Sequence, residues 1–369
     1  MAKFDALMKS FQYTPNLGIH PGAGLFRTAA THSWYVKSGW VVEGAGMYAT
    51  TVQLGGNVST ISGASCIHSD STAATDNVTV SDLTLDCNWP ELSATAPMGA
   101  GGEKNFVANA INIGGSNNLI QRVRSINSYG SSANSREQFA IAVVSPGSAN
   151  GTNNVIDSCR AEQPQGNYGS PFALVGRIPY LIVNSKVVSS TVVGVNTGVF
   201  AGFTSGGVNL AYVKDCQIDG NTFIDCQGAS YQDTGSCDGL QITNNTVIRG
   251  WQGVGLANQI LPKQNITISG NNFSIQNRVP GGGSFGIVTR YAAITNLTIN
   301  NNTITFDTSG HGMLQFYGVL ASLFNSATIS NNTIGLAPLG VYNAASGSPL
   351  TMFNNRWSNG TLIPALNNQ

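Results

Sequence analysis

Paired asparagines recur through the second half of the chain at a nearly constant interval. The pairs stand at Asn244-Asn245, Asn271-Asn272, Asn301-Asn302, Asn331-Asn332 and Asn354-Asn355. Each pair follows a short stretch with apolar residues at alternate positions, as in Leu297-Thr-Ile-Asn-Asn-Asn-Thr-Ile304. The second asparagine of a pair recurs after 23 to 30 residues, an interval typical of repeat architectures. The sequence therefore predicts a solenoid in which each copy forms one coil.

The spacing within each copy identifies the elements as strands. Apolar residues at every second position mark a strand with one buried face, whereas a helical repeat needs apolar spacings of three and four. Thr, Ile, Val and Asn are also poor helix formers. Asparagine tolerates the left-handed conformation of a sharp bend, and stacked copies would lie about 4.8 Å apart. We therefore expect the asparagine amides to hydrogen-bond along the stack as a ladder.

Composition narrows the class of protein. Charged residues make up only 9% of the 369 residues, and the formal net charge is zero. A neutral chain argues against nucleic acid and against an anionic membrane as the main partner. Apolar residues reach 41% and alternate strictly, which indicates an ordered, all-β protein. No apolar stretch of about 18 residues is present, so we expect no transmembrane helix.

The first 60 residues do not repeat, and they carry a family resemblance. The stretches are His20-Pro-Gly-Ala-Gly-Leu-Phe26, Gly39-Trp-Val-Val-Glu-Gly-Ala-Gly-Met47 and Thr51-Val-Gln-Leu54. They resemble the opening motifs of the pectin-lyase-like superfamily, and the Asn-Asn-Thr-Ile copies resemble its coil repeat. The resemblance implies a right-handed parallel β-helix over nearly the whole chain. It says little about activity, because this fold carries lyases, hydrolases, epimerases and non-catalytic fibres.

This resemblance leads to a predicted division of the chain. Residues 1–60 form an N-terminal cap and the first strands, with a short amphipathic helix over 4–11, and residues 61–369 form about ten coils and the C-terminal closure. The predicted corner positions of the coils are 82, 122, 158, 185, 215, 245, 272, 302, 332 and 355. A third strand in each coil is predicted at stretches such as Ala110–Ile113, Phe139–Val144 and Phe285–Arg290.

The predicted third strands suggest where a ligand binds. Residues that point outward there, or that flank the strand ends, combine amide, arginine, histidine and tyrosine side chains. Such a mixture suits a sugar, since aromatic faces stack on pyranose rings and polar groups bond to hydroxyls. The predicted substrate-binding residues are Arg177, Asn258, Arg290, His311, Gln315, Tyr317 and Tyr342. The alternative is an ordinary solvated outer face.

Carboxylates are scarce, with 17 in the chain, yet several gather near residue 230. A glycoside hydrolase needs two carboxyl groups about 5 to 9.5 Å apart, one of them protonated. We predict Asp233, Asp238 and Glu162 as catalytic candidates: Asp233 lies on the predicted third strand, Asp238 follows in the next turn, and Glu162 belongs to a loop. The leading hypothesis is a glycoside hydrolase that acts on a polysaccharide or oligosaccharide and needs no cofactor.

Two other functions stay open. A polysaccharide lyase would need a base and a cation for the uronate carboxylate, with Arg177, Arg290 or Lys263 as candidates and Ca²⁺ as the cofactor. Gly310-His311-Gly312 resembles a polygalacturonase motif, but the accompanying aspartate motifs are missing. The third hypothesis is a non-catalytic, tailspike- or adhesin-like β-helix that binds glycans. A flat threonine array of the ice-binding type is not found by inspection of the sequence.

Location, cysteine pairing and oligomeric state are less constrained. The N-terminus has no apolar core of the secretory type, although the fold favours an extracellular or cell-surface location. A removed signal, release by another route and cytoplasmic residence are all compatible with this N-terminus. The six cysteines form no metal-binding motif, and disulfides were considered only around Cys216, Cys226 and Cys237. The oligomeric state is not predicted.

Overall fold

The computed structural model describes the strands and most of the turns between them. The described residues are 8, 10–11, 13–29, 34–69, 73–99, 104–130, 138–162, 165–166, 169–194, 207–226, 228–256, 261–276, 283–289, 294–307, 315–321, 325–335, 339–343 and 349–364. Side chains are outside this description at 29, 138, 165–166, 169, 230–234, 283, 315–321, 339 and 342–343. The chain divides into two compact units: unit 1 holds residues 1–195 and 202–205, and unit 2 holds 196–201 and 206–369.

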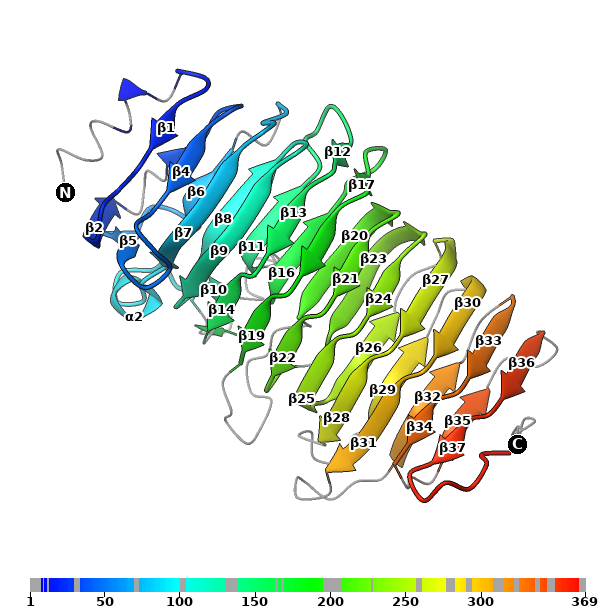
Figure 1. Cartoon of the computed structure of the whole chain (residues 1–369). Helices are drawn as coiled ribbons and strands as arrows, with labels where there is room; N and C mark the ends of the chain where they lie inside the picture. The colour runs from blue at the N-terminus through cyan, green and yellow to red at the C-terminus, as the bar shows by residue number, and fades with distance from the viewer. Residues whose placement is uncertain are drawn as a thin grey trace. The chain divides into compact units, whose positions relative to one another are not determined.

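Unit 1 is built from short strands and one short helix (Figure 1). Its strands are β1 (Gly18–Ile19), β2 (Gly24–Ala29), β3 (Trp34–Tyr35), β4 (Val41–Glu43), β5 (Thr50–Gly55), β6 (Gly63–His68), β7 (Thr79–Asp86), β8 (Val107–Gly114), β9 (Leu119–Ile126), β10 (Tyr129–Gly130), β11 (Gln138–Val144), β12 (Gly151–Thr152), β13 (Val155–Asp157), β14 (Arg160–Glu162), β15 (Gln165–Gly166), β16 (Gly169–Val175), β17 (Ile182–Val183), β18 (Lys186–Val188) and β19 (Thr191–Val193). The helix is α2 (Trp89–Leu92).

Unit 2 continues with strands alone among its described residues. They are β20 (Val208–Lys214), β21 (Gln217–Asp219), β22 (Thr222–Ile224), β23 (Ser230–Asp238), β24 (Gln241–Thr243), β25 (Thr246–Gly250), β26 (Gln252–Leu256), β27 (Lys263–Ser269), β28 (Asn272–Gln276), β29 (Gly283–Thr289), β30 (Ile294–Asn300), β31 (Thr303–Asp307), β32 (Gln315–Ala321), β33 (Ala327–Ser330), β34 (Thr333–Ile334), β35 (Leu339–Asn343), β36 (Leu350–Phe353) and β37 (Arg356–Trp357). No helix in the described part of the chain is long and apolar enough to cross a membrane.

The strands of unit 1 pair in parallel to form three sheets. The first sheet runs β1–β4–β7–β9–β13–β18 and the second runs β2–β5–β7–β9–β14–β19. The long strands β7 and β9 turn the corner between these sheets and belong to both. The third sheet runs β3–β6–β8–β11–β16. Each circuit of the chain thus adds one parallel strand to each sheet, as a parallel β-helix requires.

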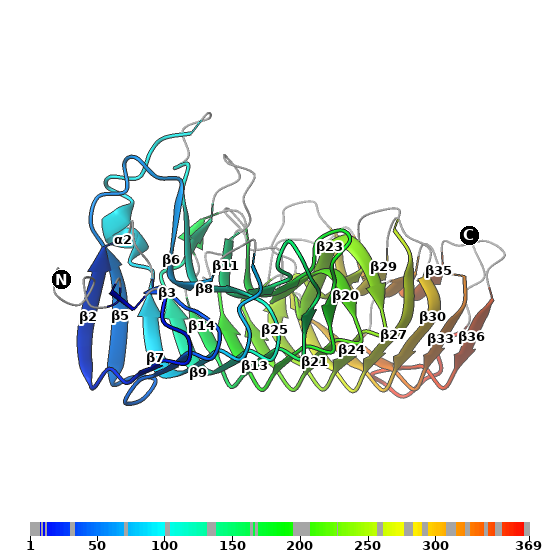
Figure 2. The ribbon, with the colours of Figure 1, turned by 90° about the horizontal axis from the view of Figure 1, so that it is seen from above.

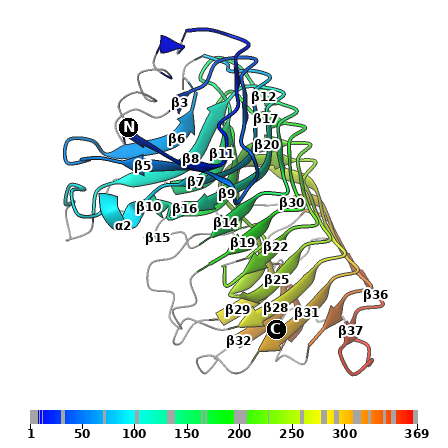
Figure 3. The ribbon, with the colours of Figure 1, turned by 60° about the vertical axis from the view of Figure 1, so that its left-hand side comes forward.

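Unit 2 repeats the same arrangement. Its first sheet runs β21–β24–β27–β30–β33–β36, its second β22–β25–β28–β31–β34–β37, and its third β23–β26–β29–β32–β35. Figure 3 shows β22, β25, β28 and β31 as successive layers. The predicted third strands therefore exist, and β29 pairs with β32 as the spacing predicted. The coil number and the N-terminal cap stay predictions.

The predicted asparagine ladder is present in the interior of unit 2. Asn302 donates from Nδ2 to Asn332 Oδ1 at 2.9 Å, and its own Oδ1 accepts from Asn271 Nδ2 at 2.9 Å. Each Nδ2 also reaches a backbone carbonyl, such as that of Ile268 at 2.9 Å. The ladder consists of Asn221, Asn245, Asn271, Asn302, Asn332 and Asn355. It satisfies buried polar groups that the bend of each coil leaves open.

The predicted corner series is wrong at several positions. Asn272 is exposed on a strand and Asn271 takes the ladder place, because Gly270 supplies the positive φ of that bend. Ser185 and Asp215 belong to the other corner of their coils, where Asn184 and Asp215 have positive φ. The corner between the first and second sheets, which carries the asparagine ladder in unit 2, is formed at Ser189 in one coil of unit 1 and at Gly220 in one coil of unit 2. Serine makes this bend at Ser189 without an asparagine after it, whereas Gly220 is followed by the ladder residue Asn221.

The interiors of both units are apolar. Inward side chains are fully buried, as Ile111, Ile141 and Phe172 are on the third sheet of unit 1. Burial of such side chains contributes roughly 1.5 to 3 kcal/mol each. In the predicted helix over 4–11, Met8 and Ser10 are helical and Met8 is buried, whereas residues 1–7 and 9 lie outside the described residues.

Candidate functional site

Charged and amide side chains gather on the outer face of the second sheet of unit 1. Parallel register places Arg27, Gln53 and Asp86 in one column on β2, β5 and β7. The same column continues through Ile126 on β9 to Glu162 on β14. Inward neighbours in the same strands, such as Leu85, are fully buried, so the column lies on the outside. Side chains distant in sequence thereby share one surface.

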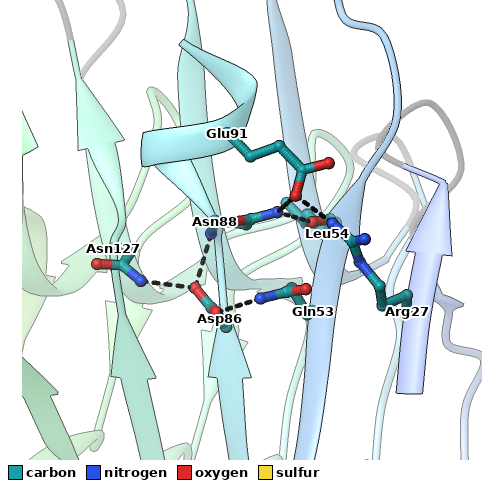
Figure 4. Close-up of polar contacts among 7 residues, drawn as sticks. All are labelled: Arg27, Gln53, Leu54, Asp86, Asn88, Glu91 and Asn127. Atoms are coloured by element: carbon teal, nitrogen blue, oxygen red, sulfur yellow. Dashed lines mark hydrogen bonds and ion pairs between the residues drawn. The ribbon is translucent and has the colours of Figure 1, made fainter. Parts of the chain in front are cut away.

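Asp86 is the centre of a polar cluster that consists of Arg27, Gln53, Asp86, Asn88, Glu91 and Asn127 (Figure 4). Its Oδ2 accepts from Gln53 Nε2 at 2.7 Å. Its Oδ1 accepts from Asn127 Nδ2 and from the Asn88 backbone N–H, both at 2.8 Å. The side chain is only 7% exposed, so these donors replace water around the carboxylate.

Asn88 connects this carboxylate to helix α2. It has a left-handed backbone (φ 52°) at the N-cap of α2, a conformation that asparagine tolerates. Its Nδ2 donates to Leu54 O and to Glu91 Oε2, both at 2.8 Å. Arg27 Nη2 also bonds Glu91 Oε2, which ties α2 to strand β2. Figure 2 shows α2 beside β2 and β5, and Figure 4 shows Glu91 above the Asp86 column.

A second group on this face, the arginine–glutamate cluster, consists of Tyr48, Arg124, Arg160 and Glu162. Arg124 and Arg160 are direct register partners on β9 and β14, so two like charges stand side by side. Glu162 relieves the repulsion: its Oε2 accepts from Arg124 Nε at 2.8 Å, and its Oε1 accepts from Arg160 Nε. The guanidinium carbon of Arg124 lies 5.3 Å from the Tyr48 ring centroid. The Tyr48 residue is 71% exposed.

The electrostatics keep the glutamates of this face ionised. Burial by itself would raise the pKa of Glu162, but hydrogen bonds from Arg160 and Arg124 outweigh it and the pKa is lowered. The pKa of Glu91 is also lowered, mainly by the hydrogen bond from Asn88 and further by Arg27. Two column steps separate Asp86 from Glu162, roughly 10 Å between backbones. The face therefore holds two carboxylates in one column, but the lowered pKa of each glutamate does not suit a protonated acid.

The predicted catalytic residues lie on different units. Glu162 is the last residue of β14 in unit 1, on the face just described. Asp233 and Asp238 are both on β23 of unit 2, and the side chain of Asp233 lies outside the described residues. Asp238 accepts from Asn265 Nδ2 at 2.7 Å and from Gln264 Nε2 at 3.0 Å. These hydrogen bonds, led by that of Asn265, lower its pKa, which does not suit a general acid.

Most of the predicted sugar-binding residues are incompletely described. Asn258, Arg290 and His311 lie outside the described residues. Gln315, Tyr317 and Tyr342 have a backbone register, on β32 and β35, but no described side chain. Arg177 is exposed after β16, where its backbone N–H bonds Tyr180 O at 2.7 Å. Their role in binding stays a prediction.

Two observations bear on the predicted third-sheet surface. In unit 1, Ala142 and Ala173 face outward between the inward residues of β11 and β16, yet both are fully buried and pack with Phe139 and Val144. This part of the third sheet is therefore apolar. Lys263, one of the cations considered for a lyase, is 1% exposed, and burial lowers its pKa. A buried amine is poorly placed to meet a polymer in solution.

Sequence reasoning missed Tyr48, Arg124 and Arg160. A signal was present, because Arg124 and Arg160 each stand two residues after a corner residue, at Arg122 and at Ser158. Aligning Gln121-Arg-Val-Arg-Ser-Ile126 with Asp157-Ser-Cys-Arg-Ala-Glu162 would have put both arginines in one column.

Two sequence comparisons bear on the family. Residues 183–362 match a family model described as "Periplasmic copper-binding protein (NosD)". A search of curated proteins finds no match. Copper prefers thiolate, thioether and imidazole ligands. Within the described residues no three His, Cys, Asp or Glu side chains are grouped to hold a metal ion. Cys216, Cys226 and Cys237 are buried, and burial, with Cys216 nearby, raises the pKa of Cys237. The described residues do not fit copper.

Solved structures agree in fold at low sequence identity. A tailspike protein of E. coli bacteriophage HK620, in complex with a pentasaccharide, matches with a TM-score of 0.68 and 14% identity over 97% of this chain and 62% of the tailspike. PfbA, a surface adhesin of Streptococcus pneumoniae, gives 0.64 and 12% over 96% and 87%. Endopolygalacturonase I from Stereum purpureum, complexed with galacturonate, gives 0.61 and 12% over 94% and 98%. The chain therefore shares the parallel β-helix fold of these proteins.

Proposed function

We propose that the protein binds a polysaccharide through the outer face of the second sheet of unit 1, outside the cytoplasm. The observation that carries this proposal is Tyr48, whose exposed ring stands beside the Arg124 guanidinium. An exposed aromatic ring offers a stacking surface to a pyranose, and it is held here by a cation–π contact. The similarity to an adhesin and to a tailspike bound to a pentasaccharide supports a glycan as ligand.

The charged groups of this face suit recognition of a polar polymer. Arg124 and Arg160 have side chains that are 27% and 36% exposed, so each can still donate to a ligand while it holds Glu162. Their orientation is set before a ligand arrives, which reduces the entropy lost on binding. Gln53 and the half-exposed Glu91 extend the same surface along the stack, which suits a ligand longer than one sugar.

Hydrolysis of the bound glycan is a second candidate function. Asp86 and Glu162 supply two carboxylates in one column of the second sheet, which favours it. The lowered pKa of Glu162 weighs against it, because one group must donate a proton. Asp233 and the other predicted residues of unit 2 would take part in this second function. A lyase that uses Ca²⁺ is the remaining alternative. Binding without turnover does not require any of these carboxyl groups to donate or accept a proton.

The test measures binding and turnover together over a panel of neutral and acidic polysaccharides. Affinity electrophoresis gives binding, reducing-sugar release gives hydrolysis, and absorbance at 235 nm gives lyase products. We expect retention by at least one glycan without turnover, and binding about tenfold weaker in Tyr48→Ala. Tyr13→Ala is the matched control, since Tyr13 is 81% exposed but lies before β1. Turnover that disappears in Asp233→Asn would establish the hydrolase instead.

A further inference from the structure

Two buried, free thiols lie near each other within unit 1, apart from the surface described above. Cys66 is on β6 of the third sheet, and Cys87 is the first residue after β7. Both are fully buried. Cys66 Sγ lies 3.8 Å from Asp86 O, the carbonyl of the residue that precedes Cys87. This contact brings Cys66 beside Cys87, and the effect of Cys66 on the pKa of the Cys87 thiol agrees with it.

We propose that Cys66 and Cys87 form a disulfide when the protein folds in an oxidising compartment. The bond would join the third sheet to the end of β7, immediately between Asp86 and Asn88. It would close a loop of moderate length, from β6 through β7, and so restrict the unfolded chain. The proposal holds whichever ligand the protein binds, because the two cysteines are not among the side chains proposed to contact that ligand.

The chemistry balances with a small disulfide as oxidant. One cysteine thiolate attacks oxidised glutathione, forms a mixed disulfide and releases one glutathione thiolate, which takes up a proton. The second cysteine then attacks the mixed disulfide, forms the Cys66–Cys87 bond and releases the second glutathione. The two cysteines lose two hydrogen atoms in total, and the two electrons reduce the oxidant.

The environment indicates when the bond forms. Burial, then the neighbouring Cys66, raises the pKa of the Cys87 thiol, so in the folded protein little thiolate is present to react. The thiols are also closed to solvent. Oxidation therefore belongs to folding, before the coil closes, and afterwards the buried bond is protected from reductants. An exposed regulatory disulfide would behave in the opposite way.

The other described cysteines differ from this pair. Cys159 Sγ donates to the backbone oxygens of Asp157 at 3.4 Å and Ile120 at 3.5 Å, and burial raises its pKa to about 12. No described thiol faces it, so it serves as the matched control. Cys216 and Cys237 in unit 2 are the competing pair, since Cys216 affects the Cys237 thiol.

The experiment compares the full chain secreted into an oxidising compartment with the same chain kept reduced. Free thiols are alkylated under denaturing conditions, and the digest is analysed by mass spectrometry without reduction. We expect a cross-linked peptide that contains Cys66 and Cys87, and a Tm about 5 °C higher in the oxidised protein. Alkylation of both residues in the oxidised sample, or a cross-link between Cys216 and Cys237 alone, would overturn the proposal.

Variants separate the bond from simple packing. The double variant Cys66→Ala/Cys87→Ala should abolish the Tm difference between the oxidised and reduced protein, whereas Cys159→Ala should retain it. A Tm difference that survives in the double variant would also contradict the proposal. If the double variant does not fold, the peptide analysis of the unaltered protein decides by itself.

Discussion

Units 1 and 2 use the same fold with different surfaces. Among the described residues, four arginine–carboxylate pairs belong to unit 1 and one, Arg249 with Asp225, belongs to unit 2. Unit 2 instead carries the continuous asparagine ladder and columns of threonine, such as Thr267, Thr298 and Thr328 on its first sheet. The fold therefore does not require the charges of unit 1, since unit 2 forms the same sheets without them.

The threonine column also corrects one expectation from the sequence. Register aligns Thr267, Thr298, Thr328 and Thr351 on four successive strands, an array that inspection of the sequence did not find. Threonine suits the half-exposed face of a strand, so this column needs no ligand to explain it. Charges held in fixed positions on unit 1 have no such general explanation. The contrast favours unit 1 as the part that meets a ligand.

The largest effect should come from the ladder of unit 2. Asn302→Ala removes the partner of the Asn271 backbone N–H and Nδ2, and frees the buried carbonyl of Ile268. We expect a loss on the order of 3 kcal/mol in the free energy of unfolding, measured by urea denaturation. Asn272→Ala, on an exposed strand position, is the control. An equal loss in both variants would mean that the ladder does not hold unit 2 together.

The polar cluster of unit 1 should give the next effect. Asp86→Ala leaves three donors, from Gln53, Asn88 and Asn127, without their acceptor, and should cost about 2 kcal/mol. Asp157→Ala is the control, because it breaks a similar glutamine–aspartate contact, to Gln121 at 2.9 Å, on the first sheet. Only Asp86→Ala should also weaken glycan retention. Equal glycan retention by both variants would mean that the polar cluster around Asp86 does not contribute to binding.

Acid should weaken unit 1 through Glu162. Its pKa is lowered in the folded protein, so its stabilising contribution is present above the unfolded pKa of about 4.3 and is lost as the pH falls through the lower folded value. We expect Glu162→Gln to reduce stability by about 1 kcal/mol at pH 7, and by less at acidic pH. Urea denaturation at both pH values measures this. Glu43→Gln, which alters a 50% exposed carboxylate, is the control and should change stability little at pH 7.

The smallest effect should come from exposed positions of the two units. Tyr48→Ala and Thr303→Val should each change the free energy of unfolding by less than about 0.5 kcal/mol. Only Tyr48→Ala should reduce glycan binding, because Thr303 is an exposed residue on the second sheet of unit 2. A loss of glycan binding in Thr303→Val would indicate that the binding site lies on unit 2 and not on unit 1.

The sequence predicted the parallel β-helix, whereas its coil number, its N-terminal cap and the site residues stay predictions. The apolar alternation near Asn302 and the doubled asparagines gave the strands, the parallel stacking and the ladder, because each copy repeats the same local chemistry. Prediction failed where a coil makes the same bend with another residue, as at Gly220 and Ser189. Glu162 was identified from the sequence, but its partners Arg124 and Arg160 were not.

Local sequence determined the β-helix because its period, its alternation and its bends are all set within about 30 residues. The surface was decided by register between coils, which depends on how many residues each loop inserts. Arg124 and Glu162 are 38 residues apart, further than the regular repeat, yet they share a hydrogen bond. The corner residues Arg122 and Ser158 already align that pair in the sequence. Only the tertiary structure could place the Tyr48 ring and the two buried thiols, since those contacts join coils whose spacing the sequence does not reveal.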